Sequence, residues 1–376
     1  MEKQKKLAIL AVSAVALLVL PLLLQMAGNF WVRIADVALL YVMLALGLNI
    51  VVGYAGLLDL GFVAFFAIGA YMYGLMASPH LSSTFEWFAA TFPDGLHTSI
   101  WLVIPLGAAL AGTFGILLGA PTLKLRGDYL AIVTLGFGEI IRVFLNNLDH
   151  PVNLTNGPKG LGQIDSITLL KFDSLGIKGL NLGRRLDIGD FTVSSVTLYY
   201  YLFLALAVLS VIICHRLEVS RVGRAWMAIR EDEIAAKAMG INTRNMKLLA
   251  FGMGATFGGV SGTMFAAFQG FVSPESFSLM ESVMIVAMVV LGGIGHLPGV
   301  ILGAVLLSAL PEVLRWVSGA LDLQAATGGR LDPAILRQLL IALAMIIVML
   351  LRPRGLWPSP EHGKSLQKNG KSGSAA

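Results

Sequence analysis

Stretches of about twenty consecutive apolar residues recur along the whole chain, and no other feature limits its fold so strongly. A helix needs roughly 20 mostly apolar residues to cross the hydrocarbon core of a bilayer, because it rises about 1.5 Å per residue. Regions of this kind cover residues 7–27, 34–52, 54–77, 101–119, 129–146, 196–214, 246–270, 282–314 and 336–351. The sequence therefore predicts an all-α polytopic membrane protein.

The region 282–314 is too long for one span. The run Gly292-Gly-Ile-Gly-His-Leu-Pro-Gly299 interrupts it, and glycine and proline clusters mark turns. We expect two helices or one broken helix here, and a re-entrant element stays open as an alternative. Two helices bring the total to about ten transmembrane or broken helices.

Composition agrees with a membrane protein and excludes other classes. Charged residues make up 13% of the chain and hydrophobic residues 56%, whereas a soluble domain carries about 25% charged residues. The net charge of +5 is not arranged as a basic stripe with interleaved aromatics, so we expect no nucleic-acid partner. A surplus of Lys and Arg is typical of cytoplasmic loops in membrane proteins. The single cysteine, Cys214, excludes an intramolecular disulfide.

The distribution of positive charge predicts the orientation of the spans. With the lysines of the first six residues in the cytoplasm, ten alternating spans place both termini and the segment 216–247 inside, and the loop 148–195 outside. The segment 216–247 holds seven Lys/Arg against four acidic residues, and the loop 148–195 holds five of each. This bias follows the positive-inside rule. We expect one transmembrane domain over residues 1–361 and a disordered polar tail over 362–376.

Motifs for catalysis or cofactor binding do not occur in the sequence. The chain has neither the glycine-lysine loop that cradles nucleotide phosphates nor a His/Cys metal pattern, and it lacks a nucleophile elbow. We expect no catalytic residues, no metal and no cofactor bound by this chain. If ATP drives its activity, another chain has to hydrolyse it.

Polar or glycine-rich positions inside apolar regions are candidates for a translocation pathway. The run Gly53-Tyr-Ala-Gly-Leu-Leu-Asp-Leu-Gly61 breaks one region, and Gly292 and Gly293 break another. Broken helices expose backbone groups to a polar substrate. The candidates are Gly53, Gly56, Asp59, Glu139, Arg142, Gly292 and Gly293. Alternatively, Glu139 and Arg142, three positions apart, form a structural ion pair between helices, and Asp59 faces the cytoplasmic interface.

Small residues also recur every four positions in two of the apolar regions. One series is Gly107, Ala111, Gly115 and Gly119, and the other is Gly254, Gly258, Gly262, Ala266 and Gly270. Such a series gives a helix one smooth face, along which another helix approaches closely. We interpret both series as packing surfaces.

The segment Arg230-Glu-Asp-Glu-Ile-Ala-Ala-Lys-Ala-Met-Gly-Ile-Asn242 is strongly charged for so apolar a chain. Its composition favours a helix over residues 224–239. Gly240 is a plausible C-terminal cap, and Asn242 or Thr243 caps the next helix. A short amphipathic helix presented in this way is suited to a groove on a partner protein; the alternative is a solvated loop of no special role.

The external loop contains the turn-rich run Thr155-Asn-Gly-Pro-Lys-Gly-Leu161. The loop is large enough to form a small cap that meets an external partner. Its docking candidates are Thr155, Asn156, Gly157 and Lys159.

Several of these motifs resemble a known family. Ala235-Ala-Lys-Ala-Met-Gly240 is similar to the core of the Glu-Ala-Ala-x3-Gly loop of ABC importer permeases, with Ile234 in place of the usual Glu. The stretches 53–61, 67–71, 125–140, 223–226, 230–233, 269–276 and 290–295 resemble the LivM-type permeases of branched-chain amino-acid ABC importers. The resemblance covers about residues 34–358. Many relatives have Gln and Ser where Leu57 and Asp59 stand.

This resemblance implies a machine of five parts in a bacterial inner (plasma) membrane. A homologous second permease subunit forms a heterodimer with this chain, two ABC ATPase subunits use ATP and Mg below it, and a periplasmic or extracellular solute-binding protein delivers leucine, isoleucine or valine. The residues implied in ATPase coupling are Arg230, Glu231, Asp232, Glu233, Ala235, Ala236 and Gly240. The alternatives are an ion-coupled secondary amino-acid transporter and an ABC permease for urea or short amides.

Overall fold

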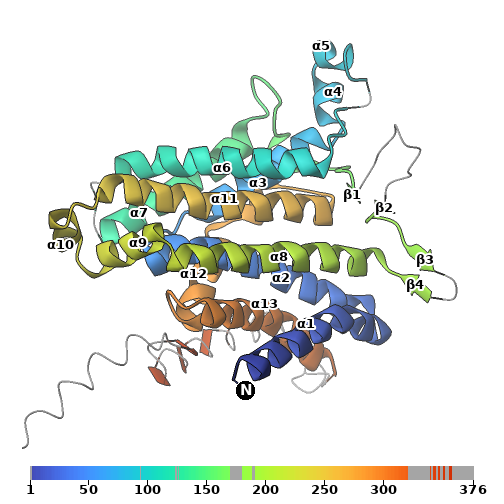
Figure 1. The fold of residues 1–376 in the computed structure, drawn as a ribbon. Helices are drawn as coiled ribbons and strands as arrows, with labels where there is room; N and C mark the ends of the chain where they lie inside the picture. Colours follow the sequence, from blue (N-terminus) through green and yellow to red (C-terminus); the bar gives the residue numbers. More distant parts are fainter. Residues whose placement is uncertain are drawn as a thin grey trace, which may run out of the picture.

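The computed structural model describes residues 2–93, 95–122, 125, 127–169, 180–188 and 191–320, together with 339, 342, 343, 346, 347, 350, 351 and 355–357. This part is mostly helical (Figure 1). Its long helices are α1 (Glu2–Ala27), α2 (Asn29–Asn49), α3 (Val63–Met76), α6 (Ile100–Thr122), α7 (Asp128–Asn147), α8 (Ser195–Val219), α11 (Thr243–Gln269), α12 (Leu279–Gly292) and α13 (Leu297–Ala320). Shorter ones are η1 (Ile50–Tyr54), α4 (His80–Thr84), α5 (Glu86–Ala89), η2 (Gly157–Lys159), α9 (Arg221–Glu231), α10 (Glu233–Ala238) and η4 (Pro274–Phe277).

Most of the expected spans are found as helices. Within the described residues, five helical stretches are long and apolar enough to cross a membrane: Asn29–Tyr54, Ile100–Thr122, Ser195–Val219, Thr243–Gln269 and Leu297–Trp316. Of the expected region 336–351, only seven residues lie within the described part, and all seven are helical. The count of ten spans therefore stays a prediction. The tail 362–376 lies outside the described residues.

The long region 282–314 folds as two helices. Helix α12 ends at Gly292, and Gly293 (φ 121°) and Gly295 (φ 82°) turn the chain back into α13. The two helices pack antiparallel, since a Cβ at Gly292 would lie 2.3 Å from the carbonyl oxygen of Gly299. The expectation of two helices is thus confirmed.

The region 54–77, expected as one helix, is broken. Helix α2 continues through the π-helix η1 to Tyr54, residues 55–62 are irregular, and α3 starts only at Val63. Gly56 has a φ of +68°, which a helix does not accommodate. The expected start of this helix was therefore wrong.

A similar order of elements returns in the second half of the chain. Helix α11 is followed by the irregular stretch 270–278, which contains η4, and by the 14-residue α12, just as α2 and η1 lead to the 14-residue α3. The two long helices are antiparallel, because Arg33 near the start of α2 contacts Gln269 at the end of α11, and Gly47 packs against Gly254. The two breaks therefore enter the bundle from opposite ends.

Helix α11 lies at the centre of the bundle, against α2, α3 and α6 (Figure 1). A Cβ at Gly259 would lie 2.5 Å from the carbonyl oxygen of Gly107 on α6. A Cβ at Gly262 would lie 2.0 Å from that of Phe66 on α3. The interpretation of the small-residue series as packing surfaces is confirmed, because side chains there would push the helices apart.

The loop between α7 and α8 carries two small hairpins. Strand β1 (Thr168–Leu169) pairs with β2 (Leu180–Asn181), and β3 (Leu186–Ile188) pairs with β4 (Phe191–Val193), both antiparallel. These strands lie at the opposite end of the bundle from α10 (Figure 1). This separation agrees with the expected topology, in which the loop 148–195 and the segment 216–247 are on opposite sides of the membrane.

Candidate functional site

The charged segment forms two short helices instead of one. Asp232 adopts an extended conformation (φ −153°, ψ 110°), which ends α9. Its carboxylate accepts hydrogen bonds from the backbone N–H groups of Ile234 (2.8 Å) and Ala235 (3.1 Å), so it caps α10. The expected continuous helix over 224–239 was therefore wrong, because an Asp in this position satisfies the free N–H groups of a new helix.

The turn after α10 was predicted correctly. Gly240 has a φ of +83°, in the region that favours glycine. The side chain of Asn242 accepts a hydrogen bond from the N–H of Asn245 (3.1 Å) and thereby caps α11.

Both short helices are fixed to the start of α11. The indole of Trp226, which is fully buried, donates to the carbonyl oxygen of Met246 (2.7 Å). Lys247 Nζ lies 2.8 Å from Glu233 Oε1, and the Lys247 side chain is only 7% exposed. Helices α9 and α10 are therefore each connected to α11 by one side-chain contact. From the sequence, Lys247 was considered only as one of the seven positive charges of the segment 216–247, and this ion pair was not predicted.

The outer face of α10 carries two large exposed apolar side chains next to the exposed Lys237. Ile234 is 71% exposed and Met239 is 83% exposed, whereas Ala236 is buried toward the protein. Helix α10 projects at one end of the bundle (Figure 1). Ala235, Glu231 and Asp232 are also exposed, but the Asp232 carboxylate already serves as a cap.

Arg230 points into the protein, toward both broken segments. Its guanidinium Nη1 donates to the carbonyl oxygen of Gly53 at 2.5 Å. A Cβ at Gly56 would lie 2.8 Å from Arg230 Cγ, and one at Gly295 would lie 2.8 Å from Arg230 Nη1. The family resemblance implied that Arg230 takes part in coupling to an ATPase. In the structure its side chain connects α9 to η1 and to the α12–α13 turn.

A side-chain amide completes this contact. Asn49 Oδ1 accepts a hydrogen bond from the N–H of Gly295 (2.9 Å). We refer to Asn49, Gly53, Gly56, Arg230 and Gly295 as the Arg230 cluster. Sequence reasoning missed Asn49, although an amide inside the apolar region 34–52 was a usable signal, because a polar group there requires a partner.

The other predicted pathway glycines pack tightly. A Cβ at Gly355 would lie 2.6 Å from Gly293 Cα, and the N–H groups of Leu356 and Trp357 donate to the carbonyl oxygens of Leu291 (2.8 Å) and Gly292 (3.2 Å). The segment 355–357 thus covers the α12–α13 turn. In this conformation Gly292 and Gly293 are contact points between backbones.

Asp59 lies inside the protein and is only 1% exposed. Its carboxylate Oδ1 accepts from the N–H of Gly61 (2.9 Å), and the next carbonyl, that of Leu60, accepts from Ser282 on α12 (2.5 Å). The alternative that Asp59 faces the cytoplasmic interface was therefore wrong. Its position beside a broken backbone keeps it a pathway candidate.

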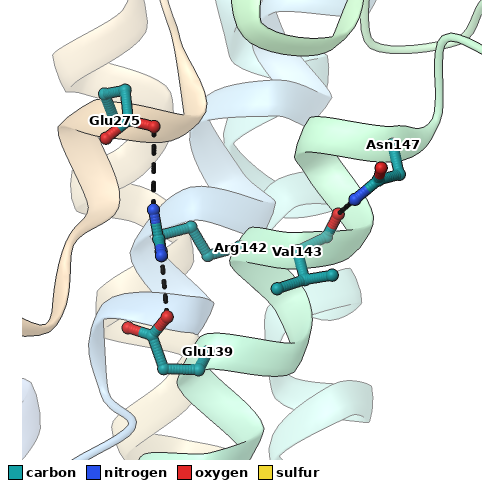
Figure 2. A network of polar contacts seen from close by, with 5 residues as sticks. All are labelled: Glu139, Arg142, Val143, Asn147 and Glu275. Atoms are coloured by element: carbon teal, nitrogen blue, oxygen red, sulfur yellow. Dashed lines mark hydrogen bonds and ion pairs between the residues drawn. The ribbon is translucent and has the colours of Figure 1, made fainter.

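Glu139 and Arg142 pair within one helix (Figure 2). Arg142 Nε donates to Glu139 Oε2 at 3.0 Å, and Arg142 Nη1 lies 3.6 Å from Glu275 Oε1 of η4. Arg142 therefore links α7 to the irregular stretch before α12. Next to this link, the amide of Asn147 donates to the carbonyl oxygen of Val143 (2.7 Å).

The predicted docking residues of the external loop differ in accessibility. The Thr155 hydroxyl is buried and donates to the carbonyl oxygen of Leu145 (2.7 Å), and Gly157 is buried with a φ of +55°. Asn156 (φ 60°) donates through Nδ2 to the carbonyl oxygen of Gly160 (2.8 Å). Lys159 is exposed. Thr155 and Gly157 stabilise the turn from within the protein, whereas the charged side chain of Lys159 lies on the protein surface. Within the described ranges, no three metal-ligating side chains gather at one point.

Known proteins resemble this chain over nearly its whole length. The profile of the family described as "Branched-chain amino acid transport system / permease component" matches residues 30–349. The high-affinity branched-chain amino acid transport system permease protein LivM of Escherichia coli (strain K12) is 40% identical over 353 residues, which are 92% of this chain and 74% of the relative. The protein of the same name in Salmonella typhimurium is 40% identical over 339 residues, 87% of this chain and 70% of the relative.

A second kind of permease also matches. The permease protein LivH of the high-affinity branched-chain amino acid transport system of Escherichia coli (strain K12) is 25% identical over 325 residues, 85% of this chain and 92% of the relative. No solved structure matches the chain.

Proposed function

Since the chain belongs to the permease family of branched-chain amino acid transport systems, we propose that it is the membrane-spanning subunit of an ATP-driven ABC importer for leucine, isoleucine and valine. The chain works as a transport subunit and catalyses no reaction itself. The substrate is a zwitterion with an apolar side chain, and it crosses by alternating access without covalent chemistry.

The importer contains further chains. The similarity of this chain to both LivM and LivH supports a heterodimer with a homologous second permease. Two ABC ATPase subunits supply the energy from ATP and Mg, and a solute-binding protein delivers the amino acid from outside. The assembly is embedded in the inner membrane, with α10 and both termini on the cytoplasmic side.

The observation that carries this proposal is that Arg230 of α9 connects this helix to the other members of the Arg230 cluster. An ATPase that moves α10 also moves α11, through the Glu233–Lys247 ion pair and the buried Trp226. The same movement acts on η1, through the hydrogen bond from Arg230 to Gly53. Because η1 and the α12–α13 turn meet at Arg230 and Asn49, one displacement changes the angle of both broken segments.

The contact with the ATPase is mainly apolar. Asp232 and Glu233 are engaged within this chain, so the tip of α10 offers Ile234 and Met239 to a groove on the ATPase. Ile234 stands where the family pattern has Glu. An apolar contact therefore replaces the acidic one, and Glu231 lies at its edge. On the outer side, Lys159 and Asn156 receive the loaded binding protein.

Reconstitution tests the proposal. The chain is purified with its second permease and ATPases, inserted into proteoliposomes, and supplied with binding protein and labelled leucine. Uptake that requires ATP is the expected result. Uptake that continues without ATP but stops when a proton gradient is dissipated would identify a secondary transporter, and transport of urea in place of leucine would identify a short-amide permease.

A further inference from the structure

A cavity of about 620 Å³ lies between α2, α12 and α13. Its volume is within the range of about 300–1,000 Å³ that is common for small-molecule sites. Arg33 lines it near the start of α2, and Tyr41 lines it eight positions further along the helix. At about 1.5 Å per residue, Tyr41 lies about 12 Å deeper than Arg33. The cavity therefore extends from the external end of α2 toward the middle of the bundle.

An acidic side chain lines the cavity at the level of Tyr41. Glu281 on α12 lines the cavity, and its Oε2 accepts a hydrogen bond from the Tyr41 hydroxyl at 2.8 Å. None of the ion pairs formed among the described residues includes Glu281. A carboxylate in the interior of a membrane bundle is costly and is usually functional. Tyr41 orients this carboxylate but does not neutralise it.

The α13 side of the cavity carries a further ion pair, because Glu312 and Arg315 also line it and lie 3.1 Å apart. Met284, Met288 and Leu307 form an apolar wall beside Glu281. At the outer end, the Arg33 guanidinium donates through Nη2 to Gln269 Oε1 (2.5 Å) and lies 5.4 Å from the ring centre of Phe268. These two contacts hold the guanidinium in place at the opening, and a guanidinium has five N–H donors in all.

We propose that this cavity is a transit site for the zwitterionic amino acid, in which Arg33 first attracts the carboxylate and Glu281 receives the ammonium group at a later, deeper position. The methionines and Leu307 receive the apolar side chain, since the thioethers adapt to different aliphatic shapes. This inference rests on the proposed function, because it takes its substrate class from there.

Substitutions that change the charge or the volume of the cavity test the inference in the complete importer. Glu281→Gln removes the charge, and Met284→Trp fills the space. Met280→Trp is the matched control for volume, because Met280 lies on the same helix, does not line the cavity and is 59% exposed. Tyr201→Phe removes a hydroxyl whose hydrogen bond goes to Leu18 on α1, and it controls for Tyr41→Phe.

ATP-dependent leucine uptake into proteoliposomes is the first measurement. We expect Glu281→Gln and Met284→Trp to lower uptake at least tenfold, and Tyr41→Phe to lower it severalfold, while both controls stay within twofold of the parent. Uptake by Glu281→Gln and Met284→Trp equal to that of the controls would overturn the inference and leave the proposed function intact. Absence of leucine uptake by the parent importer would instead overturn the proposed function.

A labelling experiment covers the case in which these variants fail to assemble. Met284→Cys, with Cys214→Ala to remove the native thiol, is modified by a small thiol reagent in the assembled importer. We expect leucine delivered by the binding protein to slow this modification at least fivefold. Equal modification rates with and without leucine would overturn the inference.

Discussion

Arg230 of α9 donates a hydrogen bond to the carbonyl oxygen of Gly53, 177 positions earlier in the chain. The bond joins α9 to the π-helix η1, which follows α2. The same guanidinium lies against Gly295, whose N–H is bound by Asn49. One side chain of the Arg230 cluster therefore contacts two breaks in the membrane helices.

Replacement of Arg230 by alanine is expected to uncouple the importer. A hydrogen bond from a charged donor contributes about 1.5–3 kcal/mol, which corresponds to roughly 10- to 100-fold in an equilibrium. We expect leucine uptake to fall at least tenfold while the ATPases remain bound and hydrolyse ATP. Arg224→Ala is the control, because Arg224 is exposed and its guanidinium donates to the carbonyl oxygen of the nearby Val219 (3.1 Å). Equal uptake by the two variants would contradict the role of Arg230.

Polar substitution at the tip of α10 is expected to weaken ATPase binding. Burial of a large apolar side chain contributes about 1.5–3 kcal/mol, so Ile234→Asp or Met239→Ser should each lower the affinity for the ATPase at least tenfold. Pull-down of the ATPase by the detergent-solubilised permease measures this. Met280→Ser removes another exposed methionine, on α12, and should leave ATPase binding unchanged; a similar loss from that variant would argue against a specific contact at α10.

The two partners of the Glu233–Lys247 ion pair are expected to differ in how much their loss destabilises the protein. Lys247 is buried and Glu233 is 29% exposed. Glu233→Gln leaves a buried ammonium without its counter-charge, which costs about 3–5 kcal/mol. Lys247→Met leaves a carboxylate that water still reaches, so its cost is smaller. Thermal unfolding in detergent should therefore give a lower Tm for Glu233→Gln than for Lys247→Met, and the reverse order would contradict the burial.

Two glycines offer a matched test of helix packing. A Cβ at Gly259 would lie 2.5 Å from the Gly107 carbonyl oxygen, whereas a Cβ at Gly136 on α7 would meet nothing within 4 Å. Overpacking of this kind costs about 1–3 kcal/mol. We expect Gly259→Ala to lower the Tm clearly, and Gly136→Ala to leave it unchanged or to raise it slightly, because alanine favours a helix. Equal Tm values would show that α11 and α6 have room to separate.

The candidate site was partly predictable from the sequence, where local chemistry decides the conformation. The turn at Gly240 and the cap at Asn242 follow from residue types that favour such positions. The break at Asp232 was not predicted, because the same residues are compatible with one continuous helix. Only the three-dimensional arrangement gave Glu233 a partner in Lys247 and thereby fixed the direction of α10.

The sequence by itself determined the membrane class, the order of the apolar helices and their small-residue faces, because the bilayer demands long apolar segments and close packing wherever they meet. The roles of individual polar residues were decided by the tertiary structure. Arg230, Asn49 and Glu281 each contact residues far away in the chain, and no local pattern encodes such contacts. Their partners exist only after α2, α9, α12 and α13 have packed together.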